Sequence, residues 1–101
     1  MGIDAYLKTI SGETTQVVGD PRSELMAFLR SASLSATVCL RFIDPFGNTT
    51  FNRPQCQVLL VELTDLRKHA AGPIAEHLDR LCRITDLAAR KGGYEIRFEG
   101  D

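Results

Sequence analysis

The sequence lacks any stretch of about 18 apolar residues, and this excludes a transmembrane helix of ordinary length. Its N-terminus, MGIDAYLKTI, has no basic segment followed by an apolar one, so we expect no signal peptide. The chain also lacks an excess of positive charge, because its 12 Lys and Arg residues are balanced by 13 Asp and Glu residues. This balance argues against a nucleic-acid partner. We therefore expect a cytoplasmic protein that binds neither nucleic acid nor membranes.

Cysteine and histidine are scarce. The three cysteines, Cys39, Cys56 and Cys82, are odd in number and form no C-x-x-C pair. This pattern argues against a disulfide framework and against a zinc site of the usual spacing, so we expect each thiol to pack as a small buried apolar group. The two histidines, His69 and His77, are predicted to lie exposed near the turn between two helices. We expect no metal and no cofactor.

The motifs of several enzyme classes are also missing. There is no G-x-S-x-G motif, and the pair Gly92-Gly93 precedes a predicted strand, whereas a phosphate-binding loop precedes a helix. Glu95 and Glu99 share one face of that strand with Arg97 between them, which is more typical of a solvated sheet face than of paired catalytic carboxylates. These absences favour a non-enzymatic protein, although an enzyme stays open.

A single domain over residues 1–101 is expected from the length, and a chain of this size can bury one core without staples. Alternation of β-forming side chains predicts its strands. The central strand is the clearest, because Val38, Leu40 and Phe42 share one face and Arg41 is its only charged residue. The predicted strands are residues 3–10, 13–18, 36–43, 49–51 and 94–99.

The first and third helices are predicted from their start and stop signals. Asp20 and Pro21 are typical of a helix start, and Ser31 to Ser33 end this first helix. Residues 73–91 form the third helix, which Gly92 ends. The short link Gly72-Pro73 before it predicts that the second and third helices are antiparallel neighbours.

The second helix, predicted over residues 53–70, could also be read in part as a strand. Helical spacing places the leucines of this segment in one stripe, and their burial outweighs the β-propensity of Val58 and Val61. Asn52 and Gln55 have the spacing of a capping box. This interpretation leaves the two valines exposed to solvent.

The predicted element order is ββαβ(β)ααβ. Helices separate the strands without forming regular βαβ units, so the expected fold class is α+β. We expect two layers, with a mixed or mostly antiparallel sheet and about three helices on one face.

The segment D-P-F-G-N-T-T-F-N-R-P-Q, residues 44–55, is followed by a leucine-rich helix, and the chain ends in F-E-G-D. These features resemble a family of small uncharacterised bacterial proteins with a D-P-aromatic-G-x-T-x-F-N-x-x-Q segment and a C-terminal F-x-G-D. The resemblance covers about the C-terminal two thirds of the chain. It supports the helix after residue 52 and implies no activity.

The loop of residues 44–52 is one candidate site. Turn chemistry and helix capping account for most of its polar residues. Asp44, Phe46 and Thr49 have no predicted structural task, so they are the candidate ligand-binding residues. This hypothesis of a small-ligand or enzymatic domain predicts a concave pocket beside the loop.

The uncovered sheet face is the other candidate site. Tyr6, Arg41 and Arg97 are predicted to share it, and Tyr and Arg are enriched in the energetic centres of protein interfaces. We therefore favour a non-enzymatic protein-interaction domain, and an inhibitor of the immunity type is a more specific version suggested only by size and class. Its partner would be another protein or a second copy of the chain.

Overall fold

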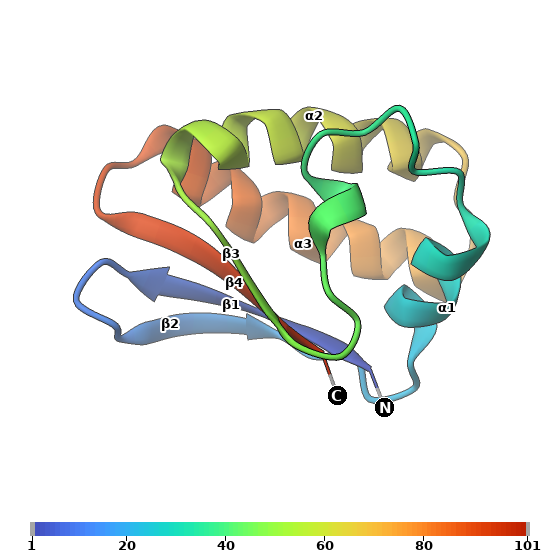
Figure 1. Ribbon diagram of the computed structural model, residues 1–101, viewed down its shortest axis with the longest axis horizontal. Coiled ribbons are helices and arrows are strands. Elements are labelled where there is room, and N and C mark those ends of the chain that lie inside the picture. The colour runs from blue at the N-terminus through green and yellow to red at the C-terminus, as the bar shows by residue number, and fades with distance from the viewer. Residues whose placement is uncertain (1, 101) are drawn as a thin grey trace.

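Helices and strands lie in two layers in the computed structural model, which describes residues 2–100 (Figure 1). Asp101, the last residue of the F-x-G-D ending, lies outside them. The elements are β1 (Ile3–Thr9), β2 (Thr14–Val18), α1 (Glu24–Ser31), the 3₁₀ helix η1 (Leu40–Phe42), β3 (Asn48–Phe51), α2 (Arg53–Lys68), α3 (Pro73–Arg90) and β4 (Tyr94–Gly100). The α+β class is confirmed. None of these helices is both long and apolar enough to cross a membrane.

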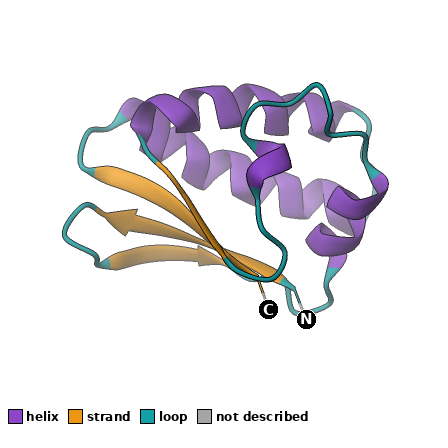
Figure 2. Ribbon diagram, in the orientation of Figure 1, coloured by secondary structure: helices purple, strands orange, loops and turns teal. Residues whose placement is uncertain are grey.

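The four strands form one antiparallel sheet in the order β2-β1-β4-β3. One face is covered by the helices and the other is open (Figure 2). Alternate residues of the two central strands point into the core, including Leu7 of β1 and Ile96 and Phe98 of β4. The alternation predicted for the last strand is therefore confirmed, and β3 is an edge strand.

The helices α2 and α3 supply most of the second layer. The capping box at the start of α2 is confirmed: the N–H of Gln55 donates to Asn52 Oδ1 over 3.0 Å, and the N–H of Asn52 donates to Gln55 Oε1 over 2.9 Å. Cys56, Leu59 and Leu63 of α2 are buried, as the apolar stripe predicts. The burial of these three residues determines which side of α2 packs on the core, and therefore which side faces solvent.

The predicted central strand over residues 36–43 is wrong. The segment is a loop that contains η1, and it crosses in front of the helix layer between α1 and β3 (Figure 1). The buried residues Cys39, Leu40 and Ile43 do not alternate with exposed ones, as a strand would require. Arg41 consequently lies on η1 and has no place in the sheet.

The carboxylate of Glu62 on α2 explains why residues 36–43 do not form the predicted strand. Its carboxylate accepts the N–H groups of three consecutive residues: Val38 over 2.5 Å, Cys39 over 3.0 Å and Leu40 over 3.0 Å. Successive amides that converge on one anion form an anion-binding nest, a conformation incompatible with a strand. The carboxylate thus takes the hydrogen bonds that a neighbouring strand would otherwise make.

The carboxylate of Asp20 binds the first turn of α1, but Asp20 lies farther before the start of this helix than predicted. The residue that precedes α1 is Ser23, whose φ of 56° lies in the left-handed region. The buried carboxylate of Asp20 nevertheless accepts the N–H groups of Leu25 and Met26 in the first turn, over 3.0 and 3.2 Å. It also accepts the N–H of Ile3 over 3.0 Å, which joins β1 to the start of α1.

Candidate functional site

A groove of about 500 Å³ opens between the edge strand β3, the start of α2 and η1. Its size is in the range of ligand-binding pockets, and its lining is mostly apolar. The side chains that line it include Val38, Phe42, Thr49, Phe51, Pro54 and Val58. The three walls come from segments that adjoin in sequence, so the sequence from residue 38 to residue 58 builds almost the whole groove.

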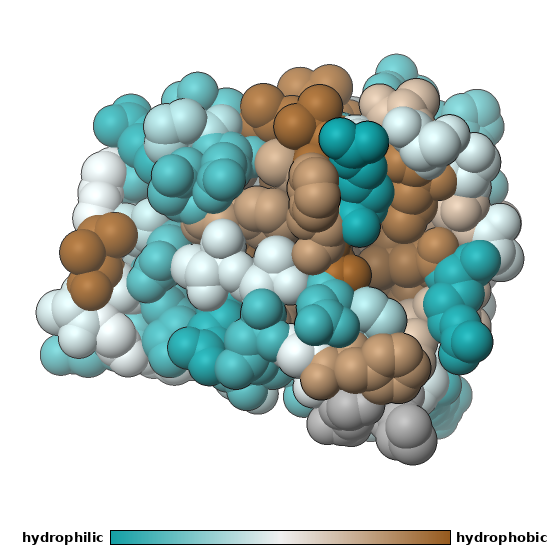
Figure 3. Space-filling view, in the orientation of Figure 1, coloured by the Kyte–Doolittle hydropathy of each residue, from teal (hydrophilic) through white to brown (hydrophobic). Residues whose placement is uncertain are grey.

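Large apolar side chains around this groove are exposed. Val38 and Phe42 are 59% and 61% exposed, and Val58 and Val61 of α2 are 39% and 62% exposed. Figure 3 shows hydrophobic surface over the middle of α2, in the upper centre of this face, and on either side of η1, with a hydrophilic side chain over η1 itself. The exposed valines predicted on α2 are confirmed, and exposed apolar side chains that gather in one region of a surface are typical of an interaction site.

The walls of the groove are held in place by hydrogen bonds. Glu62 holds the backbone before and within η1, as described above. Thr49 Oγ1 accepts the N–H of Asp44 over 2.9 Å and donates to the carbonyl of Phe42 over 3.3 Å, so β3 is tied to the end of η1. The capping box fixes the start of α2. The groove is therefore largely preformed.

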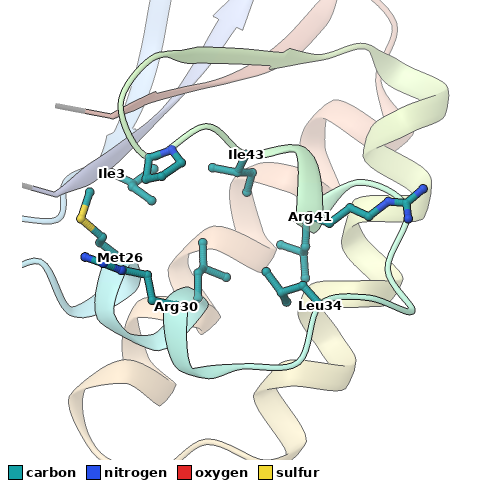
Figure 4. Close-up of a pocket in the computed structure, with 9 residues that line it drawn as sticks. Ile3, Met26, Arg30, Leu34, Arg41 and Ile43 are labelled. Atoms are coloured by element: carbon teal, nitrogen blue, oxygen red, sulfur yellow. The ribbon is translucent and has the colours of Figure 1, made fainter.

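A second, smaller cavity of about 100 Å³ lies on the other side of η1 (Figure 4). Its lining is mainly aliphatic and includes Leu34 and Ile43. Arg41 extends away from the other labelled residues (Figure 4). Its guanidinium carbon lies 4.9 Å from the ring centre of Phe42, so the charge is carried toward the larger groove.

The three candidate ligand-binding residues do not converge on one cavity. Asp44 accepts the N–H of Phe46 over 2.9 Å, which is a turn hydrogen bond, and Thr49 ties β3 to η1. The expectation that Asp44 and Thr49 have no structural task is wrong. Phe46 is 66% exposed. A concave site beside this segment does exist, but of the three only Thr49 lines the larger groove.

The candidate partner-binding residues are separated. Tyr6 of β1 and Arg97 of β4 are directly opposite each other on the uncovered face. Arg97 Nε lies 3.1 Å from Glu99 Oε2, within an ion pair. Arg41 does not join them, because the segment predicted to be its strand is the η1 loop. The mixed-charge face therefore consists of Tyr6, Arg97 and their neighbours on β1 and β4.

The cysteines are poor nucleophiles in this environment. Cys39 and Cys56 are buried, as expected, and Cys82 is half-buried. Burial raises the pKa of the Cys56 thiol to about 11, and burial followed by the charge of Glu62 raises the pKa of Cys39. A thiol with a raised pKa carries little thiolate at neutral pH. In residues 2–100, no group of three or more Cys, His, Asp or Glu side chains is arranged to hold a metal ion.

His77 is buried, which corrects the expectation of an exposed side chain. Its Nε2 has no hydrogen-bond partner among the described residues. Burial lowers the pKa of His77, and Arg80 on the same helix lowers it further. Asp20 before α1, Glu24 on α1 and Asp4 on β1 oppose this shift without reversing it. His69, by contrast, lies exposed at the end of α2, as predicted.

The lowered pKa of His77 predicts a loss of stability in mild acid. The unfolded state takes up a proton near pH 6.5 and the folded state only at lower pH, so the free energy of unfolding falls as the pH drops below 6.5. Urea unfolding of the wild type and of His77→Leu at pH 7.5 and pH 5.5 checks this. Between these two pH values, we expect the free energy of unfolding of His77→Leu to fall less than that of the wild type. That of His69→Leu should fall as much as that of the wild type. Equal declines in all three proteins would contradict the prediction.

Comparison of the chain with protein-family models, curated proteins and solved structures finds no match. The functional interpretation therefore depends on the groove. Sequence reasoning singled out Val58 and Val61 as exposed, but it missed Val38 and Phe42 because it placed them in a strand. No local signal could have identified them, because Val38 precedes the short 3₁₀ helix η1 and Glu62 of α2 determines the conformation of this segment.

Proposed function

We propose that this chain is a non-enzymatic protein-interaction domain of a small bacterial cytoplasmic protein, and that it binds another protein through the larger groove. The observation that carries the proposal is the gathering of three exposed apolar side chains, Val38, Phe42 and Val58, around one concavity, with the exposed Val61 three residues farther along α2. Transfer of such side chains from water into an interface is favourable by about 1.5–3 kcal/mol each when burial is complete. The resemblance of residues 44–55 to a segment of small bacterial proteins supports a bacterial source.

Two further features support a protein partner. The groove has no charged side chain in its lining, and its thiol, that of Cys39, has a raised pKa. Glu62, the nearest carboxylate of α2, is occupied by three backbone amides. Apolar complementarity is thus the main contribution that this surface offers to binding. An inhibitor of the immunity type would be a specific case, supported only by size and fold class.

Capture of a partner from a bacterial lysate, compared between two matched variants, tests the proposal. Val58→Asp places a charge in the groove, whereas Val17→Asp places the same charge on β2, where Val17 is 54% exposed. We expect the wild type and Val17→Asp to retain the same protein and Val58→Asp to lose at least nine tenths of it. Equal retention by both variants, or no reproducible partner, would contradict the proposal.

A further inference from the structure

The free edge of β3 has backbone groups that point toward solvent. The N–H of Gly100 donates to the carbonyl of Gly47 over 2.8 Å, so these residues form a hydrogen-bonded pair at the end of the β3–β4 ladder. Such pairs alternate along an antiparallel ladder. Thr49 and Phe51 therefore direct their backbone groups to β4, while Asn48 and Thr50 direct theirs outward. No hydrogen bond to these outward groups occurs within residues 2–100.

The other edge of the sheet is less suited to pairing. The register of β2 against β1 shifts between Leu7 and Lys8, and an irregularity of this kind twists an edge away from a would-be neighbour. The register of β3 against β4 is continuous over all four residues, and β3 contains neither Lys nor Pro. Natural edge strands usually carry such protection. Because its register is continuous, β3 is the more open of the two edges to another strand.

The groove lies directly beside this edge. Thr49 and Phe51, whose side chains point to the helix side of β3, line the groove together with Val58 and Phe42. A strand added to β3 would alternate in the same way, and its side chains on the helix side would enter the groove. Backbone pairing and apolar burial would thus be satisfied by one extended segment.

From this juxtaposition we propose that the partner of the preceding section docks as an extended strand that pairs with β3 and places alternate apolar side chains in the groove. This inference rests on the proposed function and specifies its partner. The added strand carries an acidic side chain beside η1. Arg41 makes no ion pair with residues 2–100, and its charge lies over Phe42 at the groove wall, so it is the complement of that carboxylate.

A second copy of this chain fits the site less well. A symmetric pairing of β3 with itself would offer the groove only Thr49 and Phe51 from the helix side of the copy. Thr49 is polar and is already hydrogen-bonded to η1, and Phe51 is buried in its own core. We therefore assign the groove to a different protein.

A phage-displayed library of random twelve-residue peptides, panned against the full chain, provides the probe. We expect enriched peptides to have apolar residues at alternate positions and an acidic residue near one end. One such peptide is then synthesised and its dissociation constant is measured by titration calorimetry. Thr50→Pro removes one outward N–H at an edge position where proline is tolerated, and Thr50→Val retains that N–H. We expect at least tenfold weaker binding for Thr50→Pro and less than a twofold change for Thr50→Val.

A chemically modified peptide tests strand pairing without requiring that a protein variant folds correctly. Methylation of alternate backbone nitrogens of the peptide removes the N–H groups on one edge only. We expect one methylated series to lose binding at least tenfold and the complementary series to keep it. Enriched peptides with apolar residues three and four apart, an absence of enriched peptides, or equal effects of the two methylated series would overturn strand pairing.

The two proposals fail differently in these measurements. Peptide binding that is unchanged by Val58→Asp would contradict the groove itself, and with it the proposed function. Peptide binding that Val58→Asp abolishes and that neither Thr50→Pro nor methylation affects would contradict only strand pairing. Sedimentation of the chain alone at several concentrations completes the test. A dimer that Thr50→Pro dissociates would overturn the assignment to a different protein, and a monomer throughout supports it.

Discussion

Replacement of Asp20 by alanine is expected to lower the free energy of unfolding by about 3–5 kcal/mol, because each orphaned buried amide costs on the order of 1–3 kcal/mol. The carboxylate is 2% exposed and accepts the N–H groups of Ile3, Leu25 and Met26. All three donors would be left without a partner. A domain of this size has a total stability of about 5–15 kcal/mol, so the variant should be close to unfolding.

Urea unfolding followed by circular dichroism measures this loss. Asp44→Ala is a matched control, because the Asp44 carboxylate is exposed and accepts one backbone N–H, that of Phe46. We expect it to lose about 1 kcal/mol, as capping substitutions do. Asp20→Asn retains one acceptor oxygen and should fall between the two. If Asp20→Ala were no more costly than Asp44→Ala, the three hydrogen bonds would not stabilise the fold as described.

The elements that could be predicted from the sequence are those whose signals are local. The second helix was predicted from a capping box and a leucine stripe, both of which lie within the helix or directly before it. The last strand was predicted from strict alternation between Tyr94 and Glu99. In these segments propensity, periodicity and capping all favour the same conformation, and agreement of this kind makes a prediction reliable.

The segment of residues 36–43 shows where local signals are insufficient. Its alternation favours a strand, but Glu62, more than twenty residues away, binds three of its amides and decides its conformation. A single glutamate on the polar side of a helix gives no sign of such a partner. His77 is a similar case: the helical pattern identified the apolar stripe of α3 without showing that α1 and Asp20 cover the neighbouring histidine.

Only part of the candidate site could be predicted from the sequence, and the reason is the same. Val58 and Val61 belong to a helix whose orientation could be derived, so their exposure was predicted. Phe42 and Arg41 belong to the segment whose conformation Glu62 determines, so their positions beside the groove could not be derived. The edge position of β3 depends on strand order, which sequence patterns alone do not give.

Replacement of Glu62 by alanine should accordingly affect both stability and the groove. Three amides lose a charged acceptor, and in a half-buried setting we expect a cost of about 2–4 kcal/mol. Amide hydrogen exchange should accelerate at Val38, Cys39 and Leu40 before it does so in the sheet, because only the η1 segment is released locally. Peptide binding to the groove should weaken as well, since Val38 and Phe42 form one wall.

Two controls separate this effect from a general loss of α2. Asp65→Ala removes an exposed carboxylate of the same helix, whose ion pair with Lys68 spans 3.5 Å, and it should cost less than about 0.5 kcal/mol. Glu62→Gln retains one acceptor oxygen but turns an NH₂ group toward backbone donors, so it should not restore stability. Wild-type exchange rates at Val38 to Leu40 in Glu62→Ala would contradict the role of Glu62. Faster exchange there, with α2 still protected, would show that one side chain positions a wall of the groove.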